Sequence, residues 1–221
     1  MKNKILTALF GVFLALLIIT FSIGLPIYFR PFYYMQIESL GIPEMCGEDY
    51  ATIKEAYDEV LDYLTIPGNE FGAGVFKYSE EGKSHFVDCK VLFDLNASVL
   101  IISILAVATL IILAKKGIFS MCKPFGLNII FSTGVFTLGF FGVVGGLVAI
   151  DFSAAFTVFH KIFFPGKSNW LFDWFEDQVI RILPQEFFMN CAILIFSSII
   201  ILCTLSIVVA LILRKKEKAN L

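Results

Sequence analysis

Four long apolar stretches constrain this chain more than any other feature of its sequence. They cover residues 5–29, 97–114, 125–150 and 187–213, and none of them contains Asp, Glu, Lys, Arg or His. A helix needs roughly 20 apolar residues to cross a hydrocarbon core. With 58% hydrophobic and 16% charged residues, the chain is also too apolar for an ordinary soluble domain. The sequence therefore predicts an all-α integral membrane protein with four transmembrane helices, folded as a single membrane domain over residues 1–221.

The charged residues predict which side of the membrane each connecting segment occupies. The N-terminus, the loop 115–124 and the tail 214–221 together carry nine basic residues and one acidic residue, Glu217. Segments 30–96 and 151–186 carry the other 18 of the 19 acidic residues. By the positive-inside rule, we expect both termini and the short loop to be cytoplasmic. The two larger segments should then be extracellular.

The extracellular segments predict a cap made of an amphipathic helix, short loops or strands, and an interfacial aromatic segment. One face of the expected helix carries apolar residues at helical spacing: Tyr50, Ile53, Tyr57, Val60, Leu61 and Leu64. The run NEFGAGVFKYSEEGK is typical of glycine-broken strands or loops. Ser84 is a favourable N-cap residue, so we expect a helix to begin there and to run into the second span. His85 then lies in its first turn, with Asp88 on the same face at i+3.

The chain has two histidines, His85 and His160, and both belong to the extracellular segments. Phenylalanines recur every three or four residues from Phe152 to Phe163, which predicts that the third helix continues past Asp151 and places His160 beside this stripe. The histidines could be ordinary surface residues, and the rings could be interfacial anchors. However, the two histidines lie at the ends of adjacent spans and titrate near neutral pH, so together they suit proton transfer.

Several other classes of function have little support. The spans offer no charged residue for a transporter pathway, and no G-x-S-x-G elbow is present. Cys46 and Cys89 share the extracellular side and could form a disulfide, but the absence of C-x-x-C weighs against a quinone-coupled thiol oxidoreductase. A metal site built from His85, Asp88, His160 and Asp177 would have no recognised ligand spacing. We therefore predict no metal and no cofactor.

Two segments resemble a known family. SHFVDCK at residues 84–90 and FHKIFFPGKSNWLFD, continuing to ILPQEFF, within residues 159–188 are similar to those of the lipoprotein intramolecular transacylases of Gram-positive bacteria. The resemblance covers the whole chain in topology and is specific in this pair of segments. It implies a bacterial cell-membrane enzyme that moves the sn-2 acyl chain of an S-diacylglyceryl-cysteine lipoprotein onto the α-amino group of the same cysteine. The catalytic residues it implies are His85 and His160, in an aromatic pocket where the cap meets the membrane.

The sequence also suggests how the residues around the histidines contribute. The sequence leaves open which histidine is the base. Our hypothesis is that Asp88 orients His85 as the base, while His160 assists the leaving oxygen or the developing oxyanion. Asn169 and Asp177 would support the site. The expected pocket walls are Phe156, Phe163, Phe164, Trp170 and Trp174. The expected partners are diacylated lipoproteins and membrane lipid, with no nucleic acid, and we expect a monomer. The alternatives are a non-enzymatic interaction or sensor protein that uses the acidic cap, and a lipid-ester hydrolase that releases fatty acid.

Overall fold

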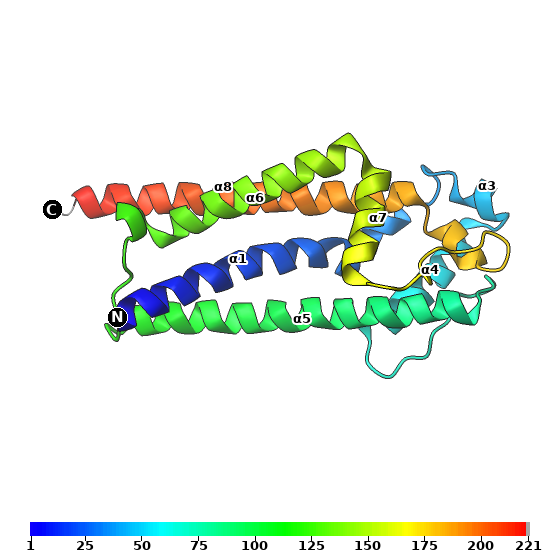
Figure 1. Cartoon of the computed structure of the whole chain (residues 1–221), viewed down its shortest axis with the longest axis horizontal. Coiled ribbons are helices and arrows are strands. Elements are labelled where there is room, and N and C mark those ends of the chain that lie inside the picture. Colours follow the sequence, from blue (N-terminus) through cyan, green and yellow to red (C-terminus); the bar gives the residue numbers. More distant parts are fainter. Residues whose placement is uncertain (220–221) are drawn as a thin grey trace. The chain divides into compact units, whose positions relative to one another are not determined.

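The computed structural model describes residues 1–219, except for the side chains of Phe125, Glu217 and Lys218. The last two residues of the predicted tail lie outside the described residues. Helices and loops form the described chain, which contains no strand. The predicted all-α fold is thus confirmed. The glycine-broken run is a loop as far as Ser79, and its last four residues belong to a helix. In order, the helices are α1 (Lys2–Tyr28), α2 (Pro31–Tyr34), α3 (Ile42–Cys46), α4 (Tyr50–Thr65), α5 (Glu80–Lys115), η1 (Pro124–Gly126), α6 (Ile129–Ile150), α7 (Phe152–Phe163), η2 (Gln178–Ile182) and α8 (Gln185–Ala219) (Figure 1).

Four of these helices, α1, α5, α6 and α8, are long and apolar enough to cross a membrane. α5 has 36 residues. At about 1.5 Å per residue it is ~54 Å long, whereas a hydrocarbon core is only about 30 Å thick. Its charged residues other than Lys115 all precede Asn96. The second half of α5 therefore suits a membrane span, and the first half, which carries His85, suits a polar environment.

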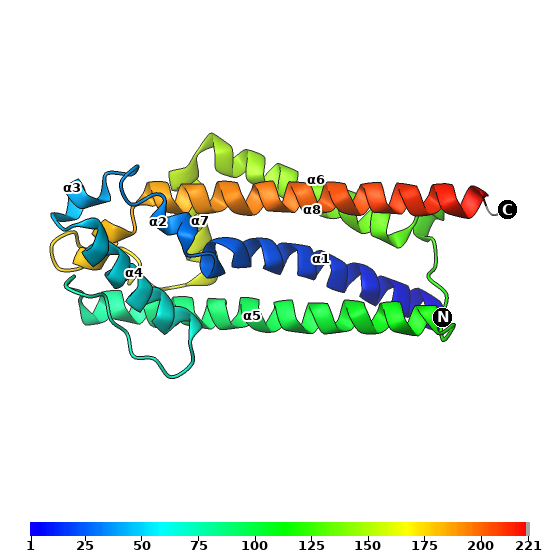
Figure 2. The same cartoon turned by 180° about the vertical axis from the view of Figure 1, so that it is seen from behind.

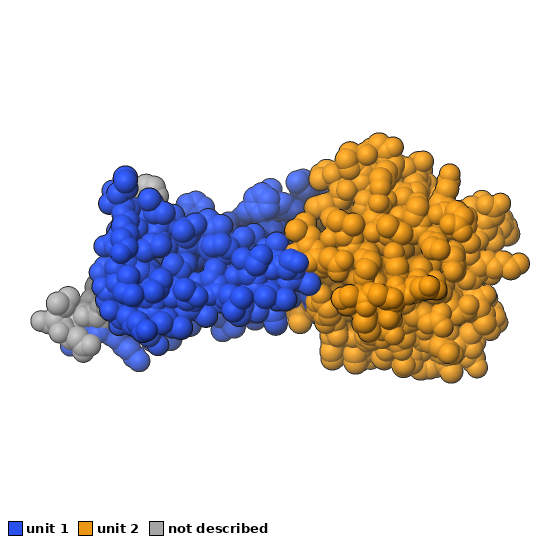
Figure 3. Space-filling model, turned by 90° about the horizontal axis from the view of Figure 1, so that it is seen from below, with its two compact units in different colours: residues 1–24, 96–147, 194–221 blue, residues 25–95, 148–193 orange. Residues whose placement is uncertain are grey.

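The chain forms two compact units, which Figure 3 distinguishes by colour. The first consists of Met1–Gly24, Asn96–Leu147 and Leu194–Leu221, and the second of Leu25–Leu95 and Val148–Ile193. The four long helices α1, α5, α6 and α8 each contribute residues to both units. Both histidines belong to the second unit.

The first unit contains the apolar parts of the four long helices. Two hydrogen bonds link helices inside it: the Ser22 and Ser198 hydroxyl oxygens lie 3.1 Å apart, and Asn96 Nδ2 donates to the Thr20 carbonyl at 3.3 Å. Within this unit α6 lies along α8, as Figures 1 and 2 both show. Buried apolar side chains form two small clusters: Phe10, Val107, Leu110 and Phe119, and Ile18, Ile199 and Cys203. Many large apolar side chains face outward, a surface suited to lipid rather than water.

The second unit has a larger apolar core, to which the predicted amphipathic helix contributes one face. α4 begins after Asp49, whose carboxylate accepts a hydrogen bond from the Thr52 amide at 2.8 Å, and such a cap satisfies a donor that has no partner within the helix. Its buried residues are Ile53, Ala56, Tyr57, Val60, Leu61 and Leu64. Of the apolar face predicted from the sequence, only Tyr50 remains exposed.

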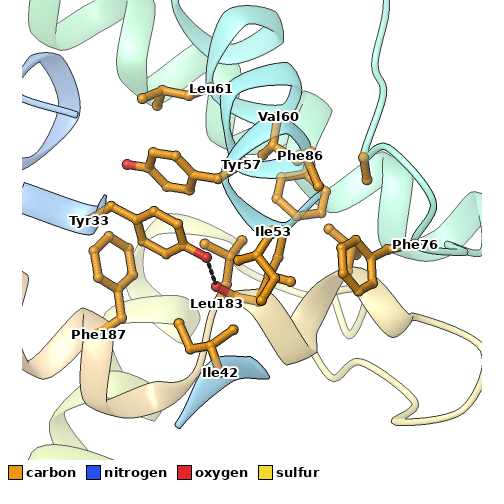
Figure 4. Packing of buried hydrophobic residues seen from close by; sticks show 14 of the residues in the cluster. Tyr33, Ile42, Ile53, Tyr57, Val60, Leu61, Phe76, Phe86, Leu183 and Phe187 are labelled. Atoms are coloured by element: carbon orange, nitrogen blue, oxygen red, sulfur yellow. Dashed lines mark hydrogen bonds between the residues drawn. The ribbon is translucent and has the colours of Figure 1, made fainter. Parts of the chain in front are cut away.

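Tyr33 joins four elements of this core (Figure 4). Its ring stacks on Tyr57 of α4 with 3.7 Å between centroids, and it meets Phe187 of α8 edge-on at 5.1 Å. Its hydroxyl donates to the carbonyl of Ile182 in η2 at 2.6 Å. The hydroxyl therefore satisfies a backbone acceptor in the interior, where water would otherwise have to do so.

We expect Tyr33→Phe to destabilise the protein, because the Ile182 carbonyl loses its buried partner. Leaving such a group unsatisfied costs about 1–3 kcal/mol, which lowers Tm by a few degrees in a chain of this size. Tyr57→Phe is the matched control, because the Tyr57 hydroxyl makes no hydrogen bond within the described chain. Thermal unfolding in detergent should show a lower Tm for Tyr33→Phe alone, and equal Tm values would contradict this role.

Candidate functional site

His85 lies in the second turn of α5, because this helix begins five residues earlier than predicted. Its first residue is Glu80, whereas an N-cap at Ser84 predicts His85. The hydroxyl of Ser79 accepts a hydrogen bond from the Gly82 amide at 2.9 Å and caps the helix. Asp177 in turn accepts hydrogen bonds from the Ser79 amide and hydroxyl at 2.8 and 2.7 Å. The helix start thus depends on a residue about a hundred positions away, which local sequence patterns could not reveal.

His160 lies on α7, which is a separate helix and not the predicted continuation of α6. The backbone of Asp151 is extended, and its carboxylate accepts a hydrogen bond from the Ala154 amide at 2.9 Å, so Asp151 is the N-cap of a new helix. The predicted continuation of α6 was wrong because the spacing of aromatic residues does not show where one helix ends and a new N-cap begins. His160 is the buried residue of α7. Phe159 and Phe163, which belong to the predicted stripe, remain about half exposed.

The two histidines face one another although 75 residues separate them in sequence. Their ring centroids lie 5.6 Å apart, with an interplanar angle of 32°. Each side chain is 6% exposed. The structure therefore brings the chain's two titratable imidazoles together in an enclosed position of the second unit.

Hydrogen bonds distinguish the two rings. His160 Nδ1 lies 2.7 Å from the carbonyl oxygen of Phe156. Since a carbonyl can only accept, Nδ1 carries the proton, and in the neutral ring Nε2 holds the free lone pair. His85 Nε2 lies 3.4 Å from Cys89 Sγ, whereas His85 Nδ1 is buried without a partner in the described structure.

Aromatic side chains surround the pair. Phe164 contacts both rings, at 4.9 Å from His85 and 5.7 Å from His160 between centroids. Phe156 and Trp170 lie against His160 at 4.3 and 4.7 Å, and the Trp170 ring is stacked. Three of the five predicted walls are therefore at the histidines.

The other two predicted walls lie elsewhere among the described side chains. Phe163 packs on Phe159, and Trp174 faces the guanidinium of Arg181. Phe172, which the sequence did not single out as a wall, lies 5.5 Å from His85. Its position was not readable from the sequence because the segment around it has no regular periodicity.

Asp88 does not orient His85 as expected. Its carboxylate pairs with Lys167 and accepts a hydrogen bond from Asn169 Nδ2 at 2.9 Å. The same amide nitrogen donates to Ser84 Oγ at 2.9 Å. Asp88 therefore attaches the loop after α7 to α5. The partner of His85 Nε2 is instead Cys89, which lies one turn beyond His85 on the same helix.

The structure also places the residues that the sequence suggested for a supporting carboxylate, a disulfide and a metal site. Asp177 holds the start of α5 through Ser79. Cys46 and Cys89 are both free thiols, so the disulfide considered from the sequence is not formed. Within the described residues, no three His, Cys, Asp or Glu side chains are grouped as metal ligands.

The surroundings of His160 favour its neutral form. Burial lowers the pKa of His160 from its ordinary value near 6.5, and the hydrogen bond to the Phe156 carbonyl offsets only part of this effect. His85 is the titratable side chain whose ring faces it. At neutral pH His160 is therefore positioned to accept a proton at Nε2.

Two comparisons with known proteins indicate one family. A sequence model described as "Lipoprotein intramolecular transacylase Lit" matches residues 8–188. The in meso structure of the membrane-integral lipoprotein intramolecular transacylase Lit from Bacillus cereus is similar over 99% of this chain and 98% of that one, with 26% identity and a TM-score of 0.88. Structures of that enzyme with the H85R and H85A mutations each match at 24% identity and a TM-score of 0.81, covering 100% and 99% of this chain and 95% and 96% of theirs. None of the curated protein sequences compared matches the chain.

We expect the imidazole of His160 to titrate below pH 6.5, because burial disfavours its charged form. With only two histidines in the chain, NMR of histidine-labelled protein in micelles should show two ring signals, and His85→Ala identifies the one that belongs to His160. The same protein unfolded in denaturant provides the reference near 6.5. A folded-state midpoint at or above the unfolded one would contradict the conclusion that burial favours the neutral form of His160.

Proposed function

The chain belongs to the lipoprotein intramolecular transacylase family and is a membrane-integral acyltransferase, and from this premise we propose the reaction that its histidine pair performs. The substrate is a bacterial lipoprotein whose N-terminal cysteine carries an S-diacylglyceryl group. The α-amino nitrogen attacks the sn-2 ester, the bond from the acyl carbon to the sn-2 oxygen breaks, and the amine proton is transferred to that oxygen. The product is the N-acyl, S-monoacylglyceryl lipoprotein, an isomer of the substrate.

The observation that carries this proposal is the enclosed pairing of His85 with His160. Transfer of an acyl group from oxygen to nitrogen needs a proton acceptor for the amine and a donor for the carbonyl oxygen. His160 offers the acceptor, since its Nε2 lone pair is free. His85 complements it if Nδ1 carries a proton, because a neutral imidazole N–H can stabilise the developing oxyanion.

His160 serves both proton transfers in this scheme. It takes a proton from the attacking amine and then, as an imidazolium, gives a proton to the departing sn-2 oxygen. The two substrate atoms are bonded to the same tetrahedral carbon, so one ring nitrogen can reach each in turn. This arrangement reverses the roles suggested by the sequence, because Asp88 binds Lys167 and Asn169 instead of orienting His85 as a base.

The aromatic walls have a separate role in this reaction. The attack closes a ring of eight atoms, and a flexible ring of that size closes slowly unless the amine and the ester are held together. Phe156, Phe164 and Trp170 surround the imidazoles closely enough to confine the substrate and exclude water. Exclusion of water favours transfer to the amine over hydrolysis.

We place the site at the outer face of the bacterial cell membrane. The loop 115–124 and both termini would be cytoplasmic, because the basic residues gather there. Segments 30–96 and 151–186, which supply both histidines, would be extracellular, where diacylated lipoproteins are anchored in lipid. One chain supplies the whole imidazole pair, so a monomer suffices.

His85→Ala and His160→Ala should each abolish conversion. Loss of a positioned base costs about 10²–10⁴-fold in rate, and loss of an oxyanion donor about 10²–10³-fold. Expressed in a cell that lacks other N-acylating enzymes, each variant should leave lipoproteins with a free α-amine and two ester chains. Because substrate and product are isomers, fragment ions that locate the acyl chain are required.

Lys161→Ala provides the matched control for these variants, since Lys161 is the exposed neighbour of His160 on α7. Full conversion by either histidine variant would remove that residue from the mechanism. Release of free fatty acid in place of N-acylation would support the hydrolase alternative.

The chain's two tryptophans form a second matched pair. Trp170 is stacked on His160, while Trp174 is half exposed against Arg181. We expect Trp170→Ala to slow transacylation about tenfold or more, because misplacing the reacting groups has a cost of this size or larger. Trp174→Ala should leave the rate near that of the unmodified enzyme. Rates would be measured with purified substrate in micelles. Equal rates for the two variants would mean that Trp170 does not position the reacting groups.

A further inference from the structure

Cys89 is the side chain in contact with His85 Nε2. We propose that Cys89 is a positioning residue whose S–H donates to His85 Nε2, which places the single proton of the neutral imidazole on Nδ1, toward the carbonyl oxygen of the substrate. This inference rests on the proposed function of the histidine pair. It concerns how His85 becomes a hydrogen-bond donor.

Geometry brings the two groups together. Cys89 follows His85 by four residues on α5, so both side chains lie on the same face of the helix. Sγ and Nε2 are 3.4 Å apart, a normal length for a hydrogen bond that involves sulfur. No other partner of either ring nitrogen of His85 occurs within the described residues.

The chemistry of the two groups gives the direction of this hydrogen bond. A thiol with an ordinary pKa of about 8.5 carries its proton at neutral pH. Sulfur is a weak acceptor, whereas the unprotonated nitrogen of a neutral imidazole is a good one. The arrangement S–H to Nε2 is therefore favoured over N–H to sulfur, and it leaves the proton of the ring on Nδ1.

The unpartnered Nδ1 indicates where the substrate binds. A buried N–H without an acceptor costs about 1–3 kcal/mol, and His160 avoids this cost by donating its Nδ1–H to Phe156. His85 Nδ1 has no such acceptor in the described structure. A substrate carbonyl oxygen would supply one, and it would do so best once it becomes an oxyanion.

A carboxylate in place of the thiol would have the opposite effect. Asp or Glu at Nε2 would accept the proton there and leave Nδ1 as a lone pair, which cannot stabilise an oxyanion. The nearby carboxylate of Asp88 is held instead by Lys167 and Asn169. The thiol is thus the group that decides the tautomer of His85.

Cys89 also packs against the apolar core of the second unit, so the test must separate hydrogen bonding from packing. Cys89→Ser keeps a donor, Cys89→Val fills the space without one, and Cys89→Ala has neither. We expect Cys89→Ser to retain at least about one third of the activity. Cys89→Val and Cys89→Ala should lose about tenfold, the equivalent of one hydrogen bond of the usual strength. Cys46→Val is the control, because Cys46 packs against the same core without contacting a histidine.

Nitrogen NMR of the two histidines gives a readout that packing alone would not change. In the folded unmodified protein, His85 should carry its proton on Nδ1, and in Cys89→Val it should shift toward Nε2. An Nε2–H tautomer in the unmodified protein would overturn the inference, as would rescue of activity by Val and not by Ser. If His85→Ala remained active, the proposed function itself would fail. If His85 proved essential while Cys89→Val kept full activity, only the role of Cys89 would fail.

Discussion

The geometry of the histidine pair depends on the hydrogen bonds that the buried carboxylate of Asp177 accepts. It is 5% exposed and accepts hydrogen bonds from the Ser79 amide, the Ser79 hydroxyl and the Asp173 amide. Hydrogen bonds to a charged group contribute about 1.5–3 kcal/mol each. The pair of Lys167 with Asp88 is far more exposed, at 48% and 19%, and such pairs contribute about 1 kcal/mol or less. Asp177 is therefore the main residue that attaches the loop after α7 to α5. Its carboxylate lies so close to Gly82 that a Cβ at position 82 would collide with it.

The sequence predicted those features that depend on local composition. Apolar length gave the four long helices, and the spacing of Ile53, Tyr57 and Leu64 gave the buried face of α4. The helix limits near the site were wrong, since the caps at Ser79 and Asp151 depend on particular hydrogen bonds rather than on periodicity.

The site was predictable only in part, for a related reason. A histidine with an acid at i+3 suggested a direct contact, but Asp88 has the longer-range partners Lys167 and Asn169. Cys89 at i+4 from His85 was within reach of the same helical argument. Its importance becomes visible only because His85 Nε2 has no other hydrogen-bond partner in the described chain. Phe172 lies in a loop whose course no local pattern determines.

A site without an adjacent free carboxylate suits the reaction proposed here. The attacking amine must be neutral, and a carboxylate in contact with it would stabilise the unreactive ammonium form. Burying an unpaired carboxylate among aromatic rings would also be costly.

A thiol can set the tautomer of His85 without adding charge. The ion pair with Lys167 similarly keeps the charge of Asp88 compensated. In the proposed reaction His160 would then meet the substrate amine as a neutral base. After transfer that nitrogen is an amide, which no longer has a proton that His160 can remove.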